Sequence, residues 1–197
     1  MIKDYLKAGY PFLTILSQEF QRAEQLLVCE GWSFMTWDCI QGIRKTGTTQ
    51  IIDDIRDPVQ AIEWLNMHSD TVLITHNMHL FLDAGVPEVI QAIQNGVARW
   101  KGSGSALVMI SPIITMQPEL EKLYTIIDLP LPDTDTLIAL QSELCSSVNV
   151  KINKKAARAA KGLTEFEAET AFSHSLVQKG YCSTRIVTDA KSQMIRR

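Results

Sequence analysis

The sequence lacks the features that would place the protein in or across a membrane. It has 197 residues, of which 46% are hydrophobic and 21% are charged. No apolar run reaches the ~18 residues that a membrane span requires. The N-terminus also lacks the apolar core of a signal peptide. Together these absences predict a globular protein with no membrane partner and a cytoplasmic location.

Closely spaced metal or redox ligands are absent as well. The four cysteines stand far apart in the sequence, at Cys29, Cys39, Cys145 and Cys182, and no pair has C-x-x-C spacing. We therefore predict buried or half-buried free thiols. His76 and His79 have no third ligand at metal-binding spacing nearby, so we expect neither a metal nor another cofactor.

Charge is distributed unevenly along the chain. Residues 1–146 contain 9 Lys and Arg against 18 Asp and Glu, whereas residues 147–197 contain 10 against 4. The basic part could complement an acidic surface, including that of a second copy. Nucleic acid is a disfavoured partner, because no aromatic interleaving or recognisable motif accompanies the charge. The candidate interaction residues are Lys151, Lys154, Lys155, Arg158 and Lys161.

Apolar runs alternate with helical patterns over the first 130 residues. The runs predicted to be strands are residues 12–16, 33–38, 71–75, 106–110 and 124–129. Helices are expected between them, one capped by Ser17 and ending near Gly31, and another beginning at Asp57-Pro58. This alternation predicts an α/β fold with a parallel five-stranded sheet sandwiched by helices, and the strand that starts at Thr71 is its centre.

Only helices are expected after the last strand. The helical segments are residues 135–144, 154–160, 164–177 and 188–195. Thr164 and Glu167 have the spacing of a capping box. We therefore predict two parts, an α/β core over residues 1–133 and a small helical lid with a C-terminal tail over residues 134–197.

The polar residues that follow the strands do not match a nucleotide site. A P-loop enzyme needs G-x-x-x-x-G-K-S/T after its first strand, because glycines let backbone N–H groups approach phosphate and the lysine neutralises it. Ser17, Gln18 and Glu19 stand there instead. The central strand ends in His76 and Asn77 rather than in acids. Ser111, which ends another strand, is interpreted as part of a turn, and residues 45–49 as a hairpin tip.

Several short segments, taken in order, form a recognisable series. They are Trp37-Asp38, Asp57-Pro58, residues 110–112, 118–121, 128–133 with Leu137, and 161–169. With these segments the chain resembles the first, degenerate domain of tandem AAA+ ATPases of the cyanobacterial and plastid (Ycf) type. The resemblance implies a P-loop-NTPase-like (AAA+-type) core that lacks the phosphate loop, a helical lid, and an intact ATPase domain joined after residues 191–197.

The resemblance also shows which ATPase parts are missing. Where a ring subunit offers an arginine finger, this sequence has Glu121-Lys122, and the helix over residues 164–177 has no arginine to sense phosphate. Our leading hypothesis is a non-catalytic pseudo-ATPase domain that assembles with or regulates an AAA+ ATPase, or associates with itself head to tail. The alternatives are a cryptic nucleotide-binding enzyme with a non-standard site, and nucleic-acid binding through the basic lid.

Overall fold

A computed structural model describes residues 2–115 and 117–194. The chain forms two compact units, Met1–Leu129 and Pro130–Arg197, which are described separately below as the α/β unit and the helical unit. The boundary expected from the sequence, after residue 133, lies four residues further along. Within the described residues, no helix combines the length and the apolar character needed to cross a membrane.

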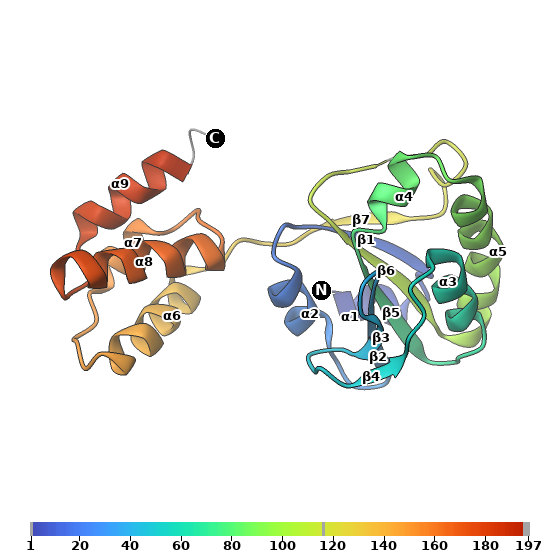
Figure 1. Ribbon diagram of the computed structural model, residues 1–197, viewed down its shortest axis with the longest axis horizontal. Coiled ribbons are helices and arrows are strands. Elements are labelled where there is room, and N and C mark those ends of the chain that lie inside the picture. Colours follow the sequence, from blue (N-terminus) through green and yellow to red (C-terminus); the bar gives the residue numbers. More distant parts are fainter. Residues whose placement is uncertain (1, 116, 195–197) are drawn as a thin grey trace. The chain divides into compact units, whose positions relative to one another are not determined.

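A mostly parallel sheet forms the middle of the α/β unit (Figure 1). Its strands, in sheet order, are β4 (Ile51–Asp53), β3 (Gly42–Lys45), β2 (Ser33–Asp38), β5 (Thr71–His76), β6 (Ala106–Ser111), β1 (Phe12–Leu16) and β7 (Thr125–Asp128). The last five of these pair in parallel, which confirms the predicted strands and the central position of β5.

The prediction of five strands was wrong because it omitted β3 and β4, which extend the sheet in antiparallel pairing. All three residues of β4 are exposed, so this edge strand has no buried face and shows no alternation of apolar and polar residues. The interpretation of residues 45–49 as a hairpin tip is confirmed, because they connect these two strands and Lys45 N donates to Gln50 O at 2.9 Å.

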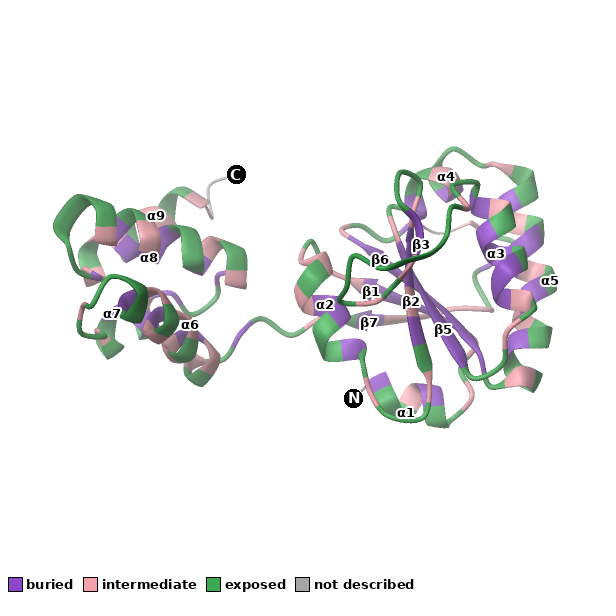
Figure 2. Cartoon of the chain, turned by 60° about the horizontal axis from the view of Figure 1, so that its bottom comes forward, coloured by how far each residue is buried: buried purple, intermediate pink, exposed green. Residues whose placement is uncertain are grey.

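Helices cover both faces of the sheet. One face packs Leu13, Ile15 and Ile74 against α1 (Ile2–Lys7) and α2 (Phe20–Leu27). The other face packs residues that include Trp37 and Leu73 against helices that follow later in the chain. Those helices are α3 (Pro58–Asn66), α4 (His79–Asp83) and α5 (Pro87–Ser103). The three layers are visible in Figure 1, and the buried sheet between them in Figure 2.

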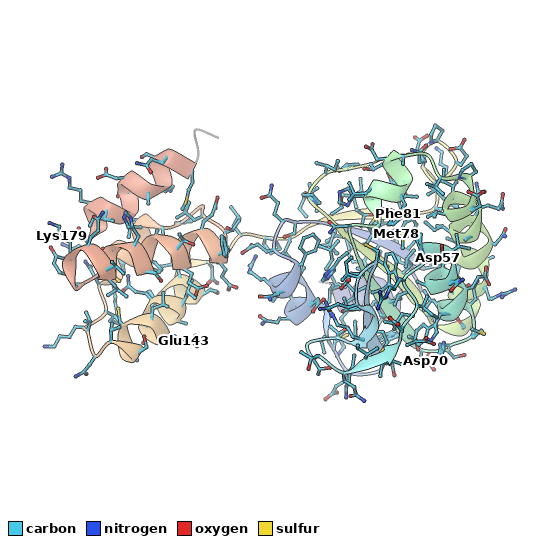
Figure 3. The ribbon with its side chains drawn as sticks, in the orientation of Figure 1. Asp57, Asp70, Met78, Phe81, Glu143 and Lys179 are labelled. Atoms are coloured by element: carbon cyan, nitrogen blue, oxygen red, sulfur yellow. The ribbon has the colours of Figure 1, made fainter. Side chains whose placement is uncertain are left out.

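Of the two N-caps predicted for helices of the α/β unit, one is present and the other is not. Asp57 accepts from Gln60 N at 2.9 Å at the start of α3, with Pro58 in the first turn, as predicted (Figure 3). Ser17 is not the N-cap of α2, since that position is taken by Glu19, whose side chain makes no capping hydrogen bond. Ser17 Oγ instead accepts from Glu19 N at 2.9 Å, which forms a local turn before the helix. The helix also ends at Leu27, before Gly31.

The helical unit has its own core. It consists of α6 (Thr134–Ser147), α7 (Lys154–Ala159), α8 (Glu165–Lys179) and α9 (Thr184–Met194). Leu137, Phe172 and Val187 are fully buried among several alanines. The predicted capping box of Thr164 and Glu167 is confirmed at the start of α8. The last helix begins earlier than predicted, and residues 195–197 of the expected join lie outside the described residues.

Two of the four cysteines meet inside the helical unit. Cys145 Sγ and Cys182 Sγ lie 3.7 Å apart, and both residues are buried; we refer to them as the thiol pair. Burial and the contact with Cys145 raise the pKa of Cys182 to about 12. Cys29 is half-buried, in line with expectation, but Cys39 is exposed, so the prediction of buried or half-buried thiols was wrong there.

Candidate functional site

The parallel strands bring the predicted polar residues to one edge of the sheet. β1, β5 and β6 end side by side, with Leu16 opposite Ser111 and His76 opposite Ile110. Ser17 N donates to Ser111 O at 2.8 Å, so the turn after β1 is held against the end of β6. In open α/β sheets this edge is where ligands bind. It is therefore the candidate site in the α/β unit.

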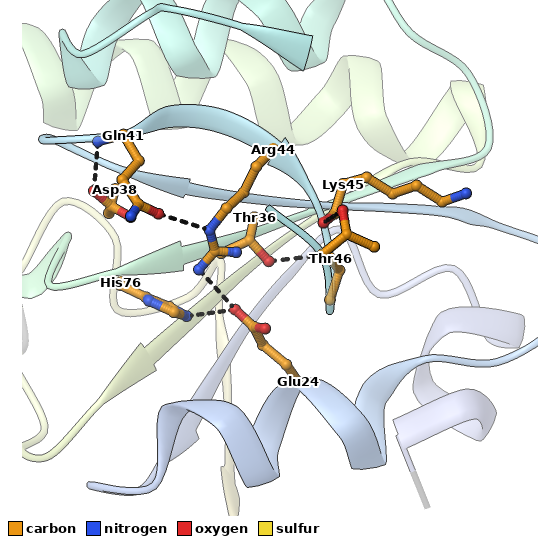
Figure 4. A network of polar contacts seen from close by, with 9 residues as sticks. Glu24, Thr36, Asp38, Gln41, Arg44, Lys45, Thr46 and His76 are labelled. Atoms are coloured by element: carbon orange, nitrogen blue, oxygen red, sulfur yellow. Dashed lines mark hydrogen bonds and ion pairs between the residues drawn. The ribbon is translucent and has the colours of Figure 1, made fainter. Parts of the chain in front are cut away.

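A buried carboxylate occupies this region (Figure 4). Glu24 extends from α2, and its Oε1 lies 2.9 Å from His76 Nε2 and 3.3 Å from Arg44 Nη2. Only 8% of the Glu24 side chain is exposed, and 14% of each partner's. The Phe20 ring covers the imidazole of His76, with 4.7 Å between ring centroids. One anion from the chain itself thus lies between two basic side chains.

The environment keeps Glu24 ionised. Burial alone would raise the pKa of Glu24, but its contacts with His76 and Arg44 outweigh burial, and the pKa is lowered from 4.5. Arg44 is fixed further by Gln41, whose Oε1 accepts from Arg44 Nε at 3.1 Å. At neutral pH the carboxylate is therefore paired and held in place, as expected for a charge buried to this extent.

The turn after β1 also carries an acidic side chain. Glu19 stands at the N-cap of α2, where the helix dipole would otherwise favour phosphate. Its backbone N–H is used by Ser17, and its carboxylate lies 3.1 Å from Arg22 Nη1. Gln18 precedes it in the same turn. A phosphate at this position would therefore meet the Glu19 carboxylate.

The remaining strand-end residues have local structural roles. Ser111 is buried, and its hydroxyl donates to Ile113 O at 2.5 Å, in line with its interpretation as a turn residue. Asn77 directly follows β5 and lies in the left-handed region with φ of 58°. His79 is buried at the start of α4, and burial lowers its pKa. Among the described residues, no group of three or more His, Cys, Asp and Glu could hold a metal ion.

Sequence reasoning did not identify Glu24 and Arg44. The signal for Glu24 was present, because it lies beside Ala23 and one helical turn before Leu27 on the buried side of α2. An acid on a buried helix face is rarely stable without a cation, so its position implied a basic partner. Nothing in the sequence indicated that the partners would be Arg44 and His76.

The candidate interaction residues lie together in the helical unit. Lys154, Lys155 and Arg158 belong to α7 and are exposed, as are Lys151 before the helix and Lys161 after it. The charge contrast is smaller than the sequence division at residue 146 indicated. Residues 130–197 contain 10 Lys and Arg against 7 Asp and Glu, and residues 1–129 contain 9 against 15. Three acids assigned to the first part belong to the helical unit.

Comparison with solved structures supports the fold over nearly the whole chain. A DNA replication initiation factor aligns at a TM-score of 0.55 and 12% identity over 99% of this chain and 62% of that one. Katanin, in a structure described as the basis for its self-assembly, aligns at 0.56 and 12% over 86% and 59%. A Thermotoga maritima RuvB variant aligns at 0.58 and 14% over 97% and 65%. The chain thus spans less than two thirds of the length of each structure.

Family matches cover both units. Residues 1–129 match the N-terminal domain of SpoVK-like AAA ATPases, and residues 137–197 match the second domain of the same proteins. No curated protein matches the chain. The first match ends at residue 129, where the α/β unit with its mostly parallel sheet ends, and the second match lies within the helical unit. The chain therefore belongs to the SpoVK-like AAA ATPase family, of which it comprises the N-terminal and second domains.

Proposed function

We propose that the chain is a non-catalytic AAA+ module, a pseudo-ATPase that assembles with or regulates an AAA+ ATPase. The finer resemblance to the degenerate first domain of tandem Ycf-type ATPases is part of this proposal. The observation that supports it best is the Glu24 carboxylate between Arg44 and His76 at the strand ends. The basic groups that could attract phosphate there already have an internal anion.

Electrostatics explains why this arrangement opposes nucleotide binding. A bound triphosphate would have to displace Glu24 from its two partners and approach Glu19 at the helix start. The sequence also lacks the glycines and the lysine that would cradle phosphate after β1. Metal clamps and arginine fingers each contribute several kcal/mol to phosphoryl transfer, so losing all of them should abolish hydrolysis.

Calorimetry and a phosphate-release assay test the catalytic part of the proposal. Titration of the 197-residue chain with ATP and Mg²⁺ is expected to give no binding heat at concentrations up to ~1 mM. Phosphate release is expected to stay at the level of buffer alone. The control variant combines Glu24→Met with Arg44→Met, so that neither charge of this pair is left buried alone, and circular dichroism checks that it is folded. Activity from a site at this edge would be lost in it, whereas a contaminating ATPase would persist. Binding that disappears in this variant would favour the cryptic nucleotide-binding enzyme.

Surface charge supports the assembly part of the proposal. The α/β unit has an excess of acids and the helical unit has an excess of bases, and exposed cations gather on and beside α7. Complementary surfaces of this kind suit a heterologous contact between the helical unit of one molecule and the α/β unit of the next. Katanin, among the similar structures, is described as self-assembling. The partner proposed here is an AAA+ ATPase or a second copy of the chain.

Light scattering of charge-reversed variants tests this contact. Replacing Lys154, Lys155 and Arg158 by Glu should reduce association, and ~0.5 M salt should do the same to the wild-type chain. The matched control replaces three exposed lysines of the α/β unit by Glu, which changes the net charge equally. These lysines are Lys3, Lys7 and Lys101. Equal loss in both variants would show a net-charge effect and refute the contact. Salt-sensitive binding to a DNA probe would favour the nucleic-acid alternative.

A further inference from the structure

The outward face of α8 displays two large apolar side chains with two hydroxyl residues between them. Phe166 is 74% exposed and Val177 is 86% exposed, with Thr170 and Ser173 between them. These four residues, called the α8 stripe, are spaced by four, three and four positions, so they lie along one side of the helix. The opposite side packs into the core of the helical unit through Ala168, Ala171, Phe172 and Ser175. Ser173 is half-buried, but Phe166, Thr170 and Val177 are exposed and lie away from the core of the unit.

The stripe can be buried at low cost. Thr170 Oγ1 donates to Phe166 O at 2.8 Å within the helix, so covering this hydroxyl leaves no unpaired donor. Tyr181, which follows the C-cap residue Gly180, is also 51% exposed. Exposed apolar side chains at both ends of one helix side give a second molecule two apolar contact points.

We propose that the α8 stripe forms a dimer by antiparallel pairing with the same stripe of a second copy. The pattern is symmetric about its midpoint, with one large apolar residue at each end and one small hydroxyl residue on each side of the centre. A twofold axis at the midpoint would place Phe166 against Val177 of the second copy, and Thr170 against its Ser173. The small central residues would let the two helices approach closely.

Charge selects the antiparallel arrangement over the parallel one. The first half of α8 carries Glu165, Glu167 and Glu169, whereas the basic residue Lys179 lies at its far end (Figure 3). Parallel pairing would place the acidic halves of the two helices together. Antiparallel pairing separates them and also opposes the helix dipoles favourably. The surface is distinct from the basic residues of α7, so this inference does not rest on the proposed function.

The expected dimer is weak. A 15-residue helix is roughly 22 Å long. A single pair of such helices buries less than the ~1,600 Å² of a standard interface, so we expect a dissociation constant on the order of 10–100 µM. Sedimentation equilibrium of the 197-residue chain between ~5 and ~500 µM should therefore show a reversible monomer–dimer equilibrium.

Two exposed positions allow the interface to be disrupted without disturbing the fold. Phe166→Glu and Val177→Glu should each weaken the dimer at least ~10-fold, because each would place a carboxylate against an apolar side chain. Leu80→Glu is the matched control, since Leu80 is 57% exposed in the α/β unit and lies outside the stripe. Circular dichroism checks that all three variants are folded. A dimer that tolerates both stripe variants would refute the proposal, as would a chain that is monomeric throughout.

Disulfide trapping tests the direction of pairing. In a Cys39→Ser background, Thr170→Cys mixed with Ser173→Cys should give cross-linked heterodimers in preference to either homodimer. Parallel pairing would instead trap each variant with itself and would refute the antiparallel arrangement. A dimer abolished by the Lys154, Lys155 and Arg158 reversal but not by Phe166→Glu would be the head-to-tail contact, which would also refute this interface. None of these outcomes depends on whether the chain hydrolyses ATP.

Discussion

Replacing Glu24 by Gln is the most direct test of the buried ion network. Gln preserves the shape of the side chain but removes the charge that lies 2.9 Å from His76 Nε2 and 3.3 Å from Arg44 Nη2. Arg44 would then be a largely buried cation without its counterion. Removing one partner of a buried ion pair costs ~3–5 kcal/mol. Because the Gln amide oxygen can still accept a hydrogen bond, we expect the unfolding free energy to fall by the lower limit of this range, about 3 kcal/mol.

The effect should depend on pH in a defined direction. The pKa of Glu24 is lowered on folding, so its contribution to stability is fully present above the unfolded value of 4.5. That contribution is lost as the pH falls through the lowered pKa of the folded state. The difference in unfolding free energy between wild type and Glu24→Gln should therefore be largest near pH 7 and should shrink as the pH falls below 4.5.

Tryptophan fluorescence can follow the affected unit alone. All the tryptophans lie in the α/β unit, at Trp32, Trp37, Trp64 and Trp100. Urea unfolding monitored by their emission therefore reports this unit without a contribution from the helical unit, which matters because a two-unit chain need not unfold in a single step. The control is Glu30→Gln, at an exposed acid of the same unit, which should change stability by less than ~0.5 kcal/mol.

Two results would refute the reasoning. If the unfolding free energy of Glu24→Gln lies within ~0.5 kcal/mol of the wild-type value at pH 7, the charge of Glu24 contributes no stability that the amide cannot replace. If the loss is large but equal at pH 7 and pH 3.5, it arises from packing rather than from the charge of Glu24. A double variant separates packing from charge. The loss of unfolding free energy in Glu24→Met combined with Arg44→Met should be smaller than the sum of the losses in the two single variants.

Two further predictions concern packing and thiol access. Gly96→Ala should destabilise the α/β unit by roughly 1–3 kcal/mol, because its Cβ would meet ring atoms of the buried Trp100 at 2.2 to 2.7 Å. Gly102→Ala in the same helix meets nothing within 4 Å and should be neutral or slightly stabilising; equal losses by urea unfolding would refute the clash. Ellman's reagent at pH 8 should modify the exposed Cys39 rapidly, but the thiol pair only after unfolding. Rapid modification of all cysteines in the folded chain would contradict this.

Local signals in the sequence correctly predicted a large part of the fold. The five parallel strands are short apolar runs that end in polar residues, and such runs reflect burial on both faces of a sheet. The caps at Asp57 and Thr164 were also predictable, because capping depends on residues only three positions apart. Local patterns gave a wrong prediction at Ser17, whose hydroxyl accepts from Glu19 N in the turn before α2 instead of capping the helix. They also missed β4, which has no buried face.

The tertiary structure alone decided how the candidate site is built. Glu24, Arg44 and His76 come from α2, β3 and β5, and no local pattern joins them because their contact depends on the order of strands in the sheet. The sequence by itself shows that no G-x-x-x-x-G-K-S/T motif follows Leu16. That a carboxylate and two basic side chains occupy this edge follows only from the fold. Long-range contacts of this kind set the electrostatics of a site, whereas the sequence by itself specifies the elements that carry them.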